Sequence, residues 1–480
     1  MNIIGREKEI EELKNLYNKD SSELVAIYGR RRVGKTYLVN QVFDNVYSFK
    51  HAGMSPLECE NGKSNAKEQL NHFYNSLKLY GMKENKKPKN WLDAFYMLEV
   101  LLSSKEDGKK QVVFIDELPW MDTPKSNFIS AFEAFWNTWA NGRNIMVIVC
   151  GSANSWIINN LINNYGGLYG RVTYEIKLEP LCLRECELLL KRNNVLLSRY
   201  DIVQAYMAVG GIPYYLNYFQ PKLTLNENID LLFFKNYSVL KDEFSRLFKS
   251  IFTSPEIIEK IVRFLAKKHI GLTKEELCEE LKMAKGESVD KALKGLLASN
   301  FIIKYKPLTD EKKMYYKLID PFCIFYLKFV DNTTSLDIDL FSGFTSKQSI
   351  VSYRGIAFEN VCFNHINQIK NALRILGVES TQSTFIYKGD GNIEGAQIDL
   401  LIERRDNIVN MCEIKYYGDE YTNDKTGHLS IVRKNNALSN FIKKRQTIRN
   451  VLITTYGLKY NEYSGDYVNT IVLDDLFKEL

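Results

Sequence analysis

The sequence predicts an α/β protein of several domains. Its 480 residues are too many for one hydrophobic core, and the length alone suggests about three domains. Two apolar segments, 24–28 and 111–115, are each followed by residues able to bind phosphate or metal, which is typical of parallel strands in an α/β sheet. After Pro255 the pattern changes to short helices and paired strands, which indicates that further domains follow.

The composition is that of an ordinary globular protein, with 45% hydrophobic and 25% charged residues and no low-complexity tract. The 64 basic and 58 acidic residues give a net charge of +6, which permits a nucleic-acid partner without arguing for one. The eight cysteines are scattered without a CxxC pair, so we expect buried thiols in a reducing compartment and neither disulfides nor zinc. A charged, amphipathic N-terminus is not a signal peptide, and no apolar run reaches the ~18 residues of a membrane span. We therefore expect a cytoplasmic protein without membrane association.

The segment 24–36 carries the strongest motif. An apolar strand, 24–28, is followed by G-x-x-x-x-G-K-T and by the start of a helix, which is the context of a phosphate-binding loop. Backbone N–H groups of such a loop face the phosphates, a lysine reaches the β- and γ-phosphates, and a hydroxyl holds Mg²⁺. The sequence therefore predicts that ATP and Mg²⁺ are cofactors, bound by Gly29, Arg30, Arg31, Arg32, Val33, Gly34, Lys35 and Thr36, with Thr36 a metal ligand.

A second buried strand, 111–115, delivers Asp116 and Glu117 to its carboxyl end. Open α/β sheets bind ligands at this edge. We expect Asp116 to belong to the Mg²⁺ shell and Glu117 to polarise the attacking water.

The remaining N-terminal elements follow in order. We expect strands over 46–50, 145–150 and 174–178 and helices over 66–79 and 91–102. Aromatic residues at helical spacing over 128–139 predict a helix packed on the sheet. Ser152 lies just after a strand, where it could sense the γ-phosphate or simply end the strand. Arg171 is either a cation directed at ATP or a surface salt-bridge residue. Helices over 181–192 and 201–209, broken by the turn 210–213, predict a small helical lid.

These motifs together resemble the archaeal and bacterial P-loop ATPases of the AAA+/STAND assemblage, the archaeal-type ATPase family. The resemblance covers about the first 240 residues and rests on Ile4-Gly5-Arg6-Glu7, the loop 29–36, Phe114-Ile115-Asp116-Glu117, Gly151-Ser152, Gly170-Arg171 and Gly210-Gly211-Ile212-Pro213. It implies an ATP-hydrolysing, five-stranded core with a helical lid. It also implies that Ser152 is a sensor and that Arg171 is a γ-phosphate or inter-subunit arginine, the latter in a homo-oligomer.

Residues 251–332 predict a winged helix, because three helices precede a strand pair over 301–305 and 314–318, with Thr273 capping the second helix. The family resemblance continues here through Asp320-Pro321-Phe322. Lysines on the third helix and on the wing could contact phosphates, namely Lys285, Lys291, Lys294, Lys304, Lys306, Lys312 and Lys313. Acidic residues crowd the second helix, so a protein–protein joint is an equal alternative.

After a polar linker, 333–352, the last domain is expected to begin with a helix over 353–375 that carries Glu359. The turn 404–407 joins two antiparallel strands, and a loop centred near Asp406 places Asp399 opposite Glu413. Strand alternation puts Lys415 on the face of Glu413. The same alternation puts four apolar residues on the other face, namely Ile398, Leu400, Cys412 and Ile414.

Two carboxylates can hold Mg²⁺ or Mn²⁺, and a lysine beside them can act on water or on transition-state charge. The pattern resembles the PD-(D/E)xK endonuclease fold, which implies that Glu359, Asp399 and Glu413 bind metal and that Lys415 is catalytic with them. Ile398 stands where that family has Pro, and Gln397 is polar where relatives often carry an acid. The alternative is a salt-bridged hairpin in a fold that does not cut. Downstream, we expect a basic surface helix carrying Arg433, Lys434, Lys443, Lys444 and Arg445.

The sequence thus predicts a P-loop core over 1–178, a lid over 179–250, a winged helix over 251–332, a linker over 333–352 and a mixed α/β, restriction-endonuclease-like domain over 353–480. The predicted function is ATP hydrolysis coupled to a metal-dependent nuclease acting on nucleic acid, more on DNA than on RNA. By analogy alone, such a layout suits mobile-element or defence biology. The alternative is an ATP-switched DNA-binding or scaffold protein whose nuclease-like fold does not cut.

Overall fold

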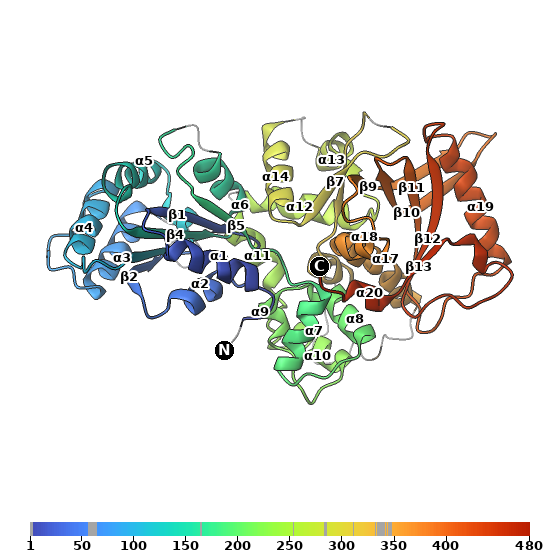
Figure 1. Cartoon of the computed structure of the whole chain (residues 1–480), viewed down its shortest axis with the longest axis horizontal. Coiled ribbons are helices and arrows are strands. Elements are labelled where there is room, and N and C mark those ends of the chain that lie inside the picture. The colour runs from blue at the N-terminus through green and yellow to red at the C-terminus, as the bar shows by residue number, and fades with distance from the viewer. Residues whose placement is uncertain are drawn as a thin grey trace. The chain divides into compact units, whose positions relative to one another are not determined.

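The computed structural model describes residues 3–55, 65–163, 166–252, 254–282, 286–310, 312–331, 333, 341, 343 and 348–480. Lys285 and most of the predicted linker 333–352 lie outside the described residues. The chain forms two compact units (Figure 1). The first unit comprises Met1–Pro180 and Ser245–Pro255, and the second comprises Leu181–Phe244 and Glu256–Leu480.

The first unit contains a five-stranded, wholly parallel sheet in the order β2-β3-β4-β1-β5. Three of its strands, β1, β3 and β4, are buried along their whole length, as expected for apolar strands covered on both faces. This sheet confirms the predicted α/β class. The strands are β1 Glu23–Tyr28, β2 Tyr47–Ala52, β3 Gln111–Asp116, β4 Ile145–Gly151 and β5 Tyr174–Lys177.

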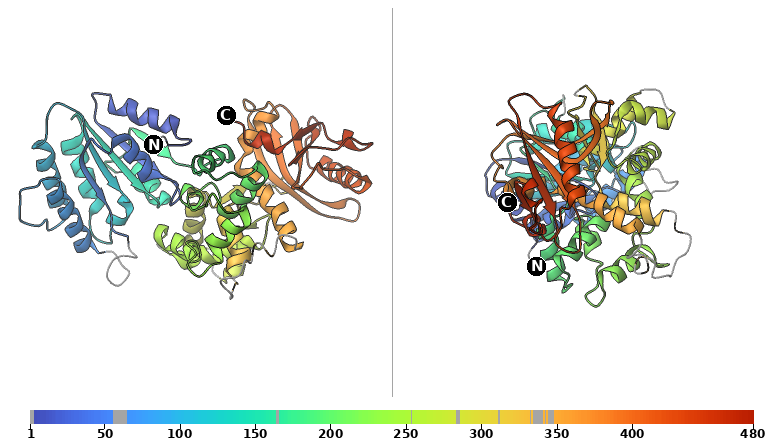
Figure 2. Two further views of the ribbon diagram at one scale, coloured as in Figure 1. Left: turned by 90° about the horizontal axis from the view of Figure 1, so that it is seen from below. Right: turned by 90° about the vertical axis from the view of Figure 1, so that its right-hand side faces the viewer.

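Helices cover both faces of this sheet (Figure 2). One face, which includes Leu24 and Ala26, shares a core with α3, α4 and α5, while α1 and α2 pack against each other. The aromatic segment predicted as core is buried at Phe128, Phe132 and Trp136. The helices are α1 Glu7–Tyr17, α2 Lys35–Phe43, α3 Ala66–Leu79, α4 Trp91–Ser103, α5 Phe128–Ala134 with its π-helical continuation Phe135–Ala140, α6 Asn154–Ile157 with Ile158–Ile162, a 3-10 turn Leu118–Met121, and α11 Glu243–Ile251.

The second unit begins with the segment predicted as the lid of the ATPase core. Its helices pack against the C-terminal elements of the same unit, since the Tyr353 hydroxyl donates to the Met207 carbonyl at 2.7 Å and the Leu183 N–H donates to His365 Nε2 at 2.9 Å. The first compact unit thus ends at Pro180, two residues after the predicted boundary at 178/179, whereas Ser245–Pro255 return to it and span the predicted boundary at 250/251. These helices are α7 Leu183–Arg192, α8 Arg199–Val209, α9 Pro213–Leu216 and α10 Leu225–Phe233.

The next elements form three helices and a three-stranded antiparallel sheet in the order β6-β8-β7. Thr273 caps α13 in a reciprocal capping box with Glu276, as its sequence position predicts. The elements are α12 Pro255–Ala266, β6 Leu272–Thr273, α13 Lys274–Leu281, α14 Glu287–Ala298, β7 Ile302–Tyr305, β8 Tyr315–Leu318 and α15 Pro321–Phe325, which continues as a π-helix, Tyr326–Val330.

The C-terminal part of the second unit is a mixed five-stranded sheet in the order β13-β12-β11-β10-β9, parallel from β11 to β13 and antiparallel elsewhere. Helix α19 covers one face, and α17 and α18 lie on the other side (Figure 1). The predicted helix 353–375 is divided near His365 into two helices. The elements are α17 Gln348–Asn364, α18 Ile366–Ala372, β9 Ser380–Gly389, β10 Glu394–Arg404, β11 Ile408–Lys415, α19 Lys425–Ser439, β12 Thr447–Thr454, a 3-10 turn Ser464–Asp466, β13 Asn469–Ile471 and α20 Leu473–Leu476.

Two local predictions for this sheet are wrong. The pairing of β10 with β9 shifts between Ile398 and Leu401, so both side chains enter the core cluster that also contains Met411. Strict alternation predicts Ile398 and Leu400 on the same face of the sheet. It fails because the irregularity adds one residue to β10. The predicted basic helix also ends early, at Ser439, so residues 443–445 lie after it.

In the described part of the chain, none of the helices has both the length and the apolar character needed to cross a membrane.

Candidate functional site

The loop after β1 has the backbone that a phosphate cradle needs. Gly29 has φ 152°, and a side chain there would collide with the carbonyl of Leu178, so only glycine fits. Gly34 has φ 100° and forms the N-cap of α2. The loop therefore leads directly into a helix N-terminus, where N–H groups favour anions.

Lys35 lies buried at this helix start, surrounded by neutral oxygens. Its Nζ donates to the carbonyls of Gly29 and Arg30, each at 3.1 Å, and to Ser152 Oγ at 2.9 Å. These contacts satisfy the ammonium hydrogens without cancelling the charge. The positive charge thus remains available for a phosphate.

Thr36, in the first turn of α2, contacts Asp116 at the end of β3. Thr36 Oγ1 donates to Asp116 Oδ2 at 2.6 Å, and the Glu117 N–H donates to Asp116 Oδ1 at 2.9 Å. Burial raises the pKa of Asp116, with a further contribution from the Glu117 carboxylate beside it. A hydroxyl and a carboxylate are oxygen donors of the kind that Mg²⁺ prefers, so these residues fit the predicted metal.

Glu117 sits at the end of β3 in a left-handed conformation, φ 44°. Its carboxylate accepts hydrogen bonds from Ser152 Oγ at 2.6 Å and from the Ser152 N–H at 3.0 Å. Ser152, at the end of β4, therefore contacts both Lys35 and Glu117. A second polar residue of this turn, Asn154, accepts from the Gly29 N–H at 2.8 Å and fixes the start of the loop.

The other loop residues surround this centre. Arg30 and Val33 are buried. Arg32 adopts φ 71°, and Arg31 Nη1 donates to the Arg246 carbonyl at 3.4 Å.

Arg171 lies apart from these residues. It is exposed and precedes β5, and the Thr173 N–H donates to the Leu24 carbonyl near the start of β1. The parallel pairing of Val25 with Tyr174 therefore puts Arg171 at the amino edge of the sheet. The loop lies at the carboxyl edge, roughly 20 Å away at 3.3 Å per residue along the six residues of β1. This geometry separates Arg171 from the loop of its own chain, and it is compatible with an inter-subunit role and with a surface salt-bridge residue.

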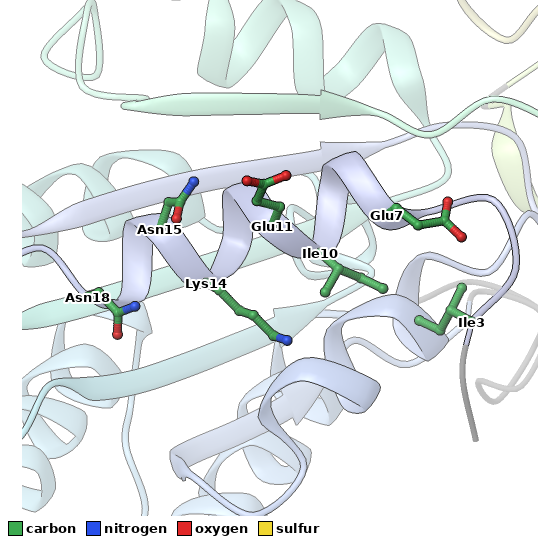
Figure 3. A pocket seen from close by; sticks show the side chains of 7 residues that line it. All are labelled: Ile3, Glu7, Ile10, Glu11, Lys14, Asn15 and Asn18. Carbon is green, nitrogen blue, oxygen red and sulfur yellow. The ribbon is translucent and has the colours of Figure 1, made fainter. Parts of the chain in front are cut away.

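A hollow of about 550 Å³ lies along the exposed side of α1, and Figure 3 shows the side chains that line it. None of the predicted site residues lines it; its lining residues are Ile3, Glu7, Ile10, Glu11, Lys14, Asn15 and Asn18.

A second group of charged residues lies on β10 and β11. Glu413, 6% exposed, holds two ammonium groups: Lys415 Nζ lies 2.7 Å from Oε1, and Lys434 Nζ lies 2.5 Å from Oε2. Lys415 thus shares the face of Glu413. Lys434 comes from α19, and its burial contradicts its prediction as a surface cation.

Asp399 belongs to the same group. The register of β10 and β11, in which Leu400 pairs with Cys412, carries Asp399 to the position opposite Glu413. Its Oδ2 accepts from the Ile414 N–H at 3.2 Å. Burial and the Glu413 carboxylate raise the pKa of Asp399, opposed by the ammonium of Lys434.

Glu359 of α17 completes the group with a partner that the sequence analysis missed. Its Oε2 lies 3.7 Å from Nζ of Lys317, a residue of β8 that is 1% exposed. Burial first, then Asp399, raises the pKa of Glu359 to about 7. Burial lowers the pKa of Lys317, whose Nζ lies 4.9 Å from the centroid of the Phe363 ring.

Three carboxylates, Glu359, Asp399 and Glu413, are thus matched by three lysines. Among the residues that the structure describes, no group of three acidic, histidine or cysteine side chains is arranged to hold a metal ion. Both oxygens of Glu413 face ammonium groups. The donor set in this arrangement therefore does not fit the predicted Mg²⁺ or Mn²⁺, because a hard cation needs carboxylate oxygens that are not already neutralised.

Residues 3–219 match the family described as an ATPase domain predominantly from Archaea. An uncharacterized protein of Methanocaldococcus jannaschii is 24% identical over 432 residues, which cover 86% of this chain and 87% of the relative. An uncharacterized ATP-binding protein of the same organism is 25% identical over 282 residues, covering 52% of this chain and 76% of the relative.

Among solved structures, the Walker-type ATPase of Pyrococcus abyssi is 20% identical and covers 68% of this chain and 96% of its own, with a TM-score of 0.47. That score is too low to establish a shared fold. The family match contains the loop 29–36, both strand-end acids and Ser152. It supports the resemblance to P-loop ATPases and ATP binding by this part of the chain.

Proposed function

We propose that this chain is an ATP-hydrolysing switch protein that binds nucleic acid and whose nuclease-like C-terminal domain does not cut. The proposed ATP hydrolysis rests on one observation: Lys35, Thr36, Asp116 and Glu117 lie together at one edge of a parallel sheet. The family match over residues 3–219 supports it.

The proposed roles follow from the contacts. Lys35 and the N-terminus of α2 bind the β- and γ-phosphates, exchanging neutral oxygens for charged ones. Thr36 and Asp116 hold Mg²⁺, which neutralises phosphate charge when bound. Glu117 orients the attacking water and accepts its proton.

Ser152 controls when Glu117 can act. As long as Ser152 donates two hydrogen bonds to the Glu117 carboxylate, that carboxylate is held away from a water molecule. A γ-phosphate beside Lys35 competes with Ser152 Oγ for the Lys35 ammonium, because Ser152 Oγ accepts from Lys35 Nζ, and it thereby disturbs the contacts of Ser152. Ser152 thus acts as the proposed sensor.

Arg171 acts in the proposed function only from a second copy of the chain. Its place at the amino edge of its own sheet is too far from its own loop. We therefore include a homo-oligomer in the proposal.

The segment 255–318 has the helix and strand order of a winged helix, and we propose that it contacts DNA. Its lysines on α14, on β7 and on the loop between β7 and β8 are exposed and suited to phosphates, namely Lys291, Lys294, Lys304, Lys306, Lys312 and Lys313. Lys291 Nζ lies 2.7 Å from Oε1 of the exposed Glu287, and breaking an ion pair of this kind costs little.

For the C-terminal domain, one observation favours the non-cutting alternative over the nuclease. Both oxygens of Glu413 already contact ammonium groups, and three lysines balance the three acids. Metal-dependent phosphodiester cleavage requires these acids to hold the metal instead.

The test uses purified full-length protein with ATP and with plasmid, linear and single-stranded substrates in Mg²⁺ or Mn²⁺. We expect metal-dependent phosphate release, DNA retention in a gel shift and intact substrates. Cleavage that disappears in Asp399→Ala would establish the nuclease and overturn the non-cutting proposal. Absence of phosphate release would overturn the ATPase.

A further inference from the structure

Lys434 reaches the carboxylates of the second sheet from a helix, α19, and contacts Glu413. It lies on α19, next to the buried residues Ile431, Ala437 and Leu438 that pack this helix on the sheet. Only 10% of its side chain is exposed. Its position is therefore fixed by the packing of α19.

The ammonium of Lys434 contacts one strand carboxylate and acts on the other through its charge. It lies 2.5 Å from Glu413 Oε2, and its charge opposes the rise in the pKa of Asp399. These two carboxylates are the strand ligands that a divalent metal would need. The ammonium thus occupies the electrostatic position of such a cation.

We propose that Lys434 is an internal cation that closes the Asp399–Glu413 pair to divalent metals. The inference rests on the proposed non-cutting function and names the residue responsible for it. A metal can bind the pair only if the ammonium leaves, and the side chain that carries it is only 10% exposed at the packed face of α19.

Lys415 does not perform this role, although it contacts the same carboxylate. Its side chain is 31% exposed and stands at the end of β11, where it can turn toward water without moving an element of the fold. Lys415 is therefore the matched control for Lys434. Both are lysines that contact Glu413, but Lys415 does not come from a packed helix.

The experiment measures Mn²⁺ binding by calorimetry on full-length, nucleotide-free protein. All proteins carry Asp116→Asn, so that the nucleotide site contributes no heat. We expect no saturable binding in this background. Lys434→Met should gain one saturable site whose Mn²⁺ affinity exceeds the detection limit of the titration at least tenfold, whereas Lys415→Met should stay below that limit. Adding Glu413→Gln to Lys434→Met should remove the gained site.

Lys434→Gln provides a second route if the methionine variant is unstable by thermal melting. The amide can still donate to Glu413 but carries no charge, so metal binding should again appear. Lys434→Arg keeps the charge and should leave the site closed.

Two results would overturn the inference: no gain of Mn²⁺ binding in folded Lys434→Met or Lys434→Gln, or an equal gain in Lys415→Met. These results differ from failure of the proposed function, which is read from the nuclease assay on the unmodified chain. If the unmodified chain cleaves DNA, the non-cutting function and the closed carboxylate pair are both wrong; if it does not cleave and neither folded Lys434 variant binds Mn²⁺, the inference alone is wrong.

Discussion

Two sites of this chain combine lysines with carboxylates, and they do so in opposite ways. At the edge of the first sheet, Lys35 is held by two carbonyls and a serine, and neither Asp116 nor Glu117 contacts it in an ion pair. On the second sheet, Lys415 and Lys434 contact Glu413 directly.

The difference shows which site is prepared for a charged ligand. An ammonium satisfied by neutral oxygens, and carboxylates satisfied by a hydroxyl and N–H groups, retain charges that phosphate and Mg²⁺ can use. Buried carboxylates paired with lysines have already recovered part of their desolvation cost, so an incoming cation gains less. The same residue types thus give an open site in the first unit and a closed network in the second. The open site comprises Lys35, Thr36, Asp116 and Glu117, and the closed network comprises Glu359, Asp399, Glu413, Lys317, Lys415 and Lys434.

The largest expected effect comes from removing the cation of the open site. Lys35→Ala should lower the kcat/KM of ATP hydrolysis at least 10³-fold, about 4 kcal/mol, because the phosphates lose a buried charge. Its unfolding midpoint should stay close to that of the parent, since no acid loses an ion-pair partner. Phosphate release and denaturant unfolding measure the two quantities. Parent-like hydrolysis would refute the assignment of this site.

Glu117→Gln should separate binding from chemistry at the same site. We expect kcat to fall roughly 10²- to 10³-fold, the range for loss of a general base, while ATP affinity stays within a few-fold. Single-turnover hydrolysis and nucleotide titration test this. An equal loss of affinity would indicate that Glu117 helps to bind the nucleotide.

In the closed network, removing a lysine should cost stability instead of activity. Lys317→Met leaves Glu359 buried without its partner, which should lower the free energy of unfolding by roughly 3 kcal/mol at pH 8. The raised pKa of Glu359, about 7, means that the native state binds this proton more tightly than the unfolded state. Glu359 therefore destabilises the fold increasingly as the pH rises from 4.5 through 7.

The loss in Lys317→Met should accordingly be smaller at pH 5, where Glu359 can be protonated. Urea titrations at both pH values measure it. Lys415→Met is the control, because Glu413 keeps Lys434, and it should lose less. Equal losses at both pH values would exclude an uncompensated carboxylate as the cause.

The buried histidine His365 makes the stability of the second unit depend on pH in a different way from the ion pairs. The imidazole is 1% exposed and accepts from the Leu183 N–H, and burial lowers its pKa to about 4. Because the unfolded state takes up the proton first, stability should fall as the pH drops from 6.5 to 4, by up to roughly 3 kcal/mol from this group. In His365→Gln the pH dependence of unfolding between pH 7 and pH 4.5 should be shallower than in the parent. An unchanged dependence would mean that His365 is not responsible.

The smallest expected effect concerns exposed lysines outside both sites. Lys291→Glu with Lys294→Glu should weaken DNA binding a few-fold across all sequences and reduce the salt dependence by about one ion per lost phosphate contact. Gel shifts at several salt concentrations measure both. Unchanged binding would reassign this segment to protein contacts.

The sequence by itself determined the open site, because its parts are local. The loop Gly29–Thr36 follows its strand directly, and Asp116 ends a strand whose apolar run marks it as buried and parallel. The pairing of β10 with β11 could also be predicted from the sequence, since the position of the turn places Asp399 opposite Glu413.

The tertiary structure alone decided what surrounds those residues. Lys434 follows Glu413 by 21 residues and reaches it only because α19 packs on the sheet, while Lys317 comes from another sheet of the second unit. The order of the parallel strands likewise sends Arg171 to the edge away from the loop. Periodicity and motifs encode which face of an element is buried, but not which distant element covers it, and that covering element decides whether a carboxylate meets a metal or an ammonium.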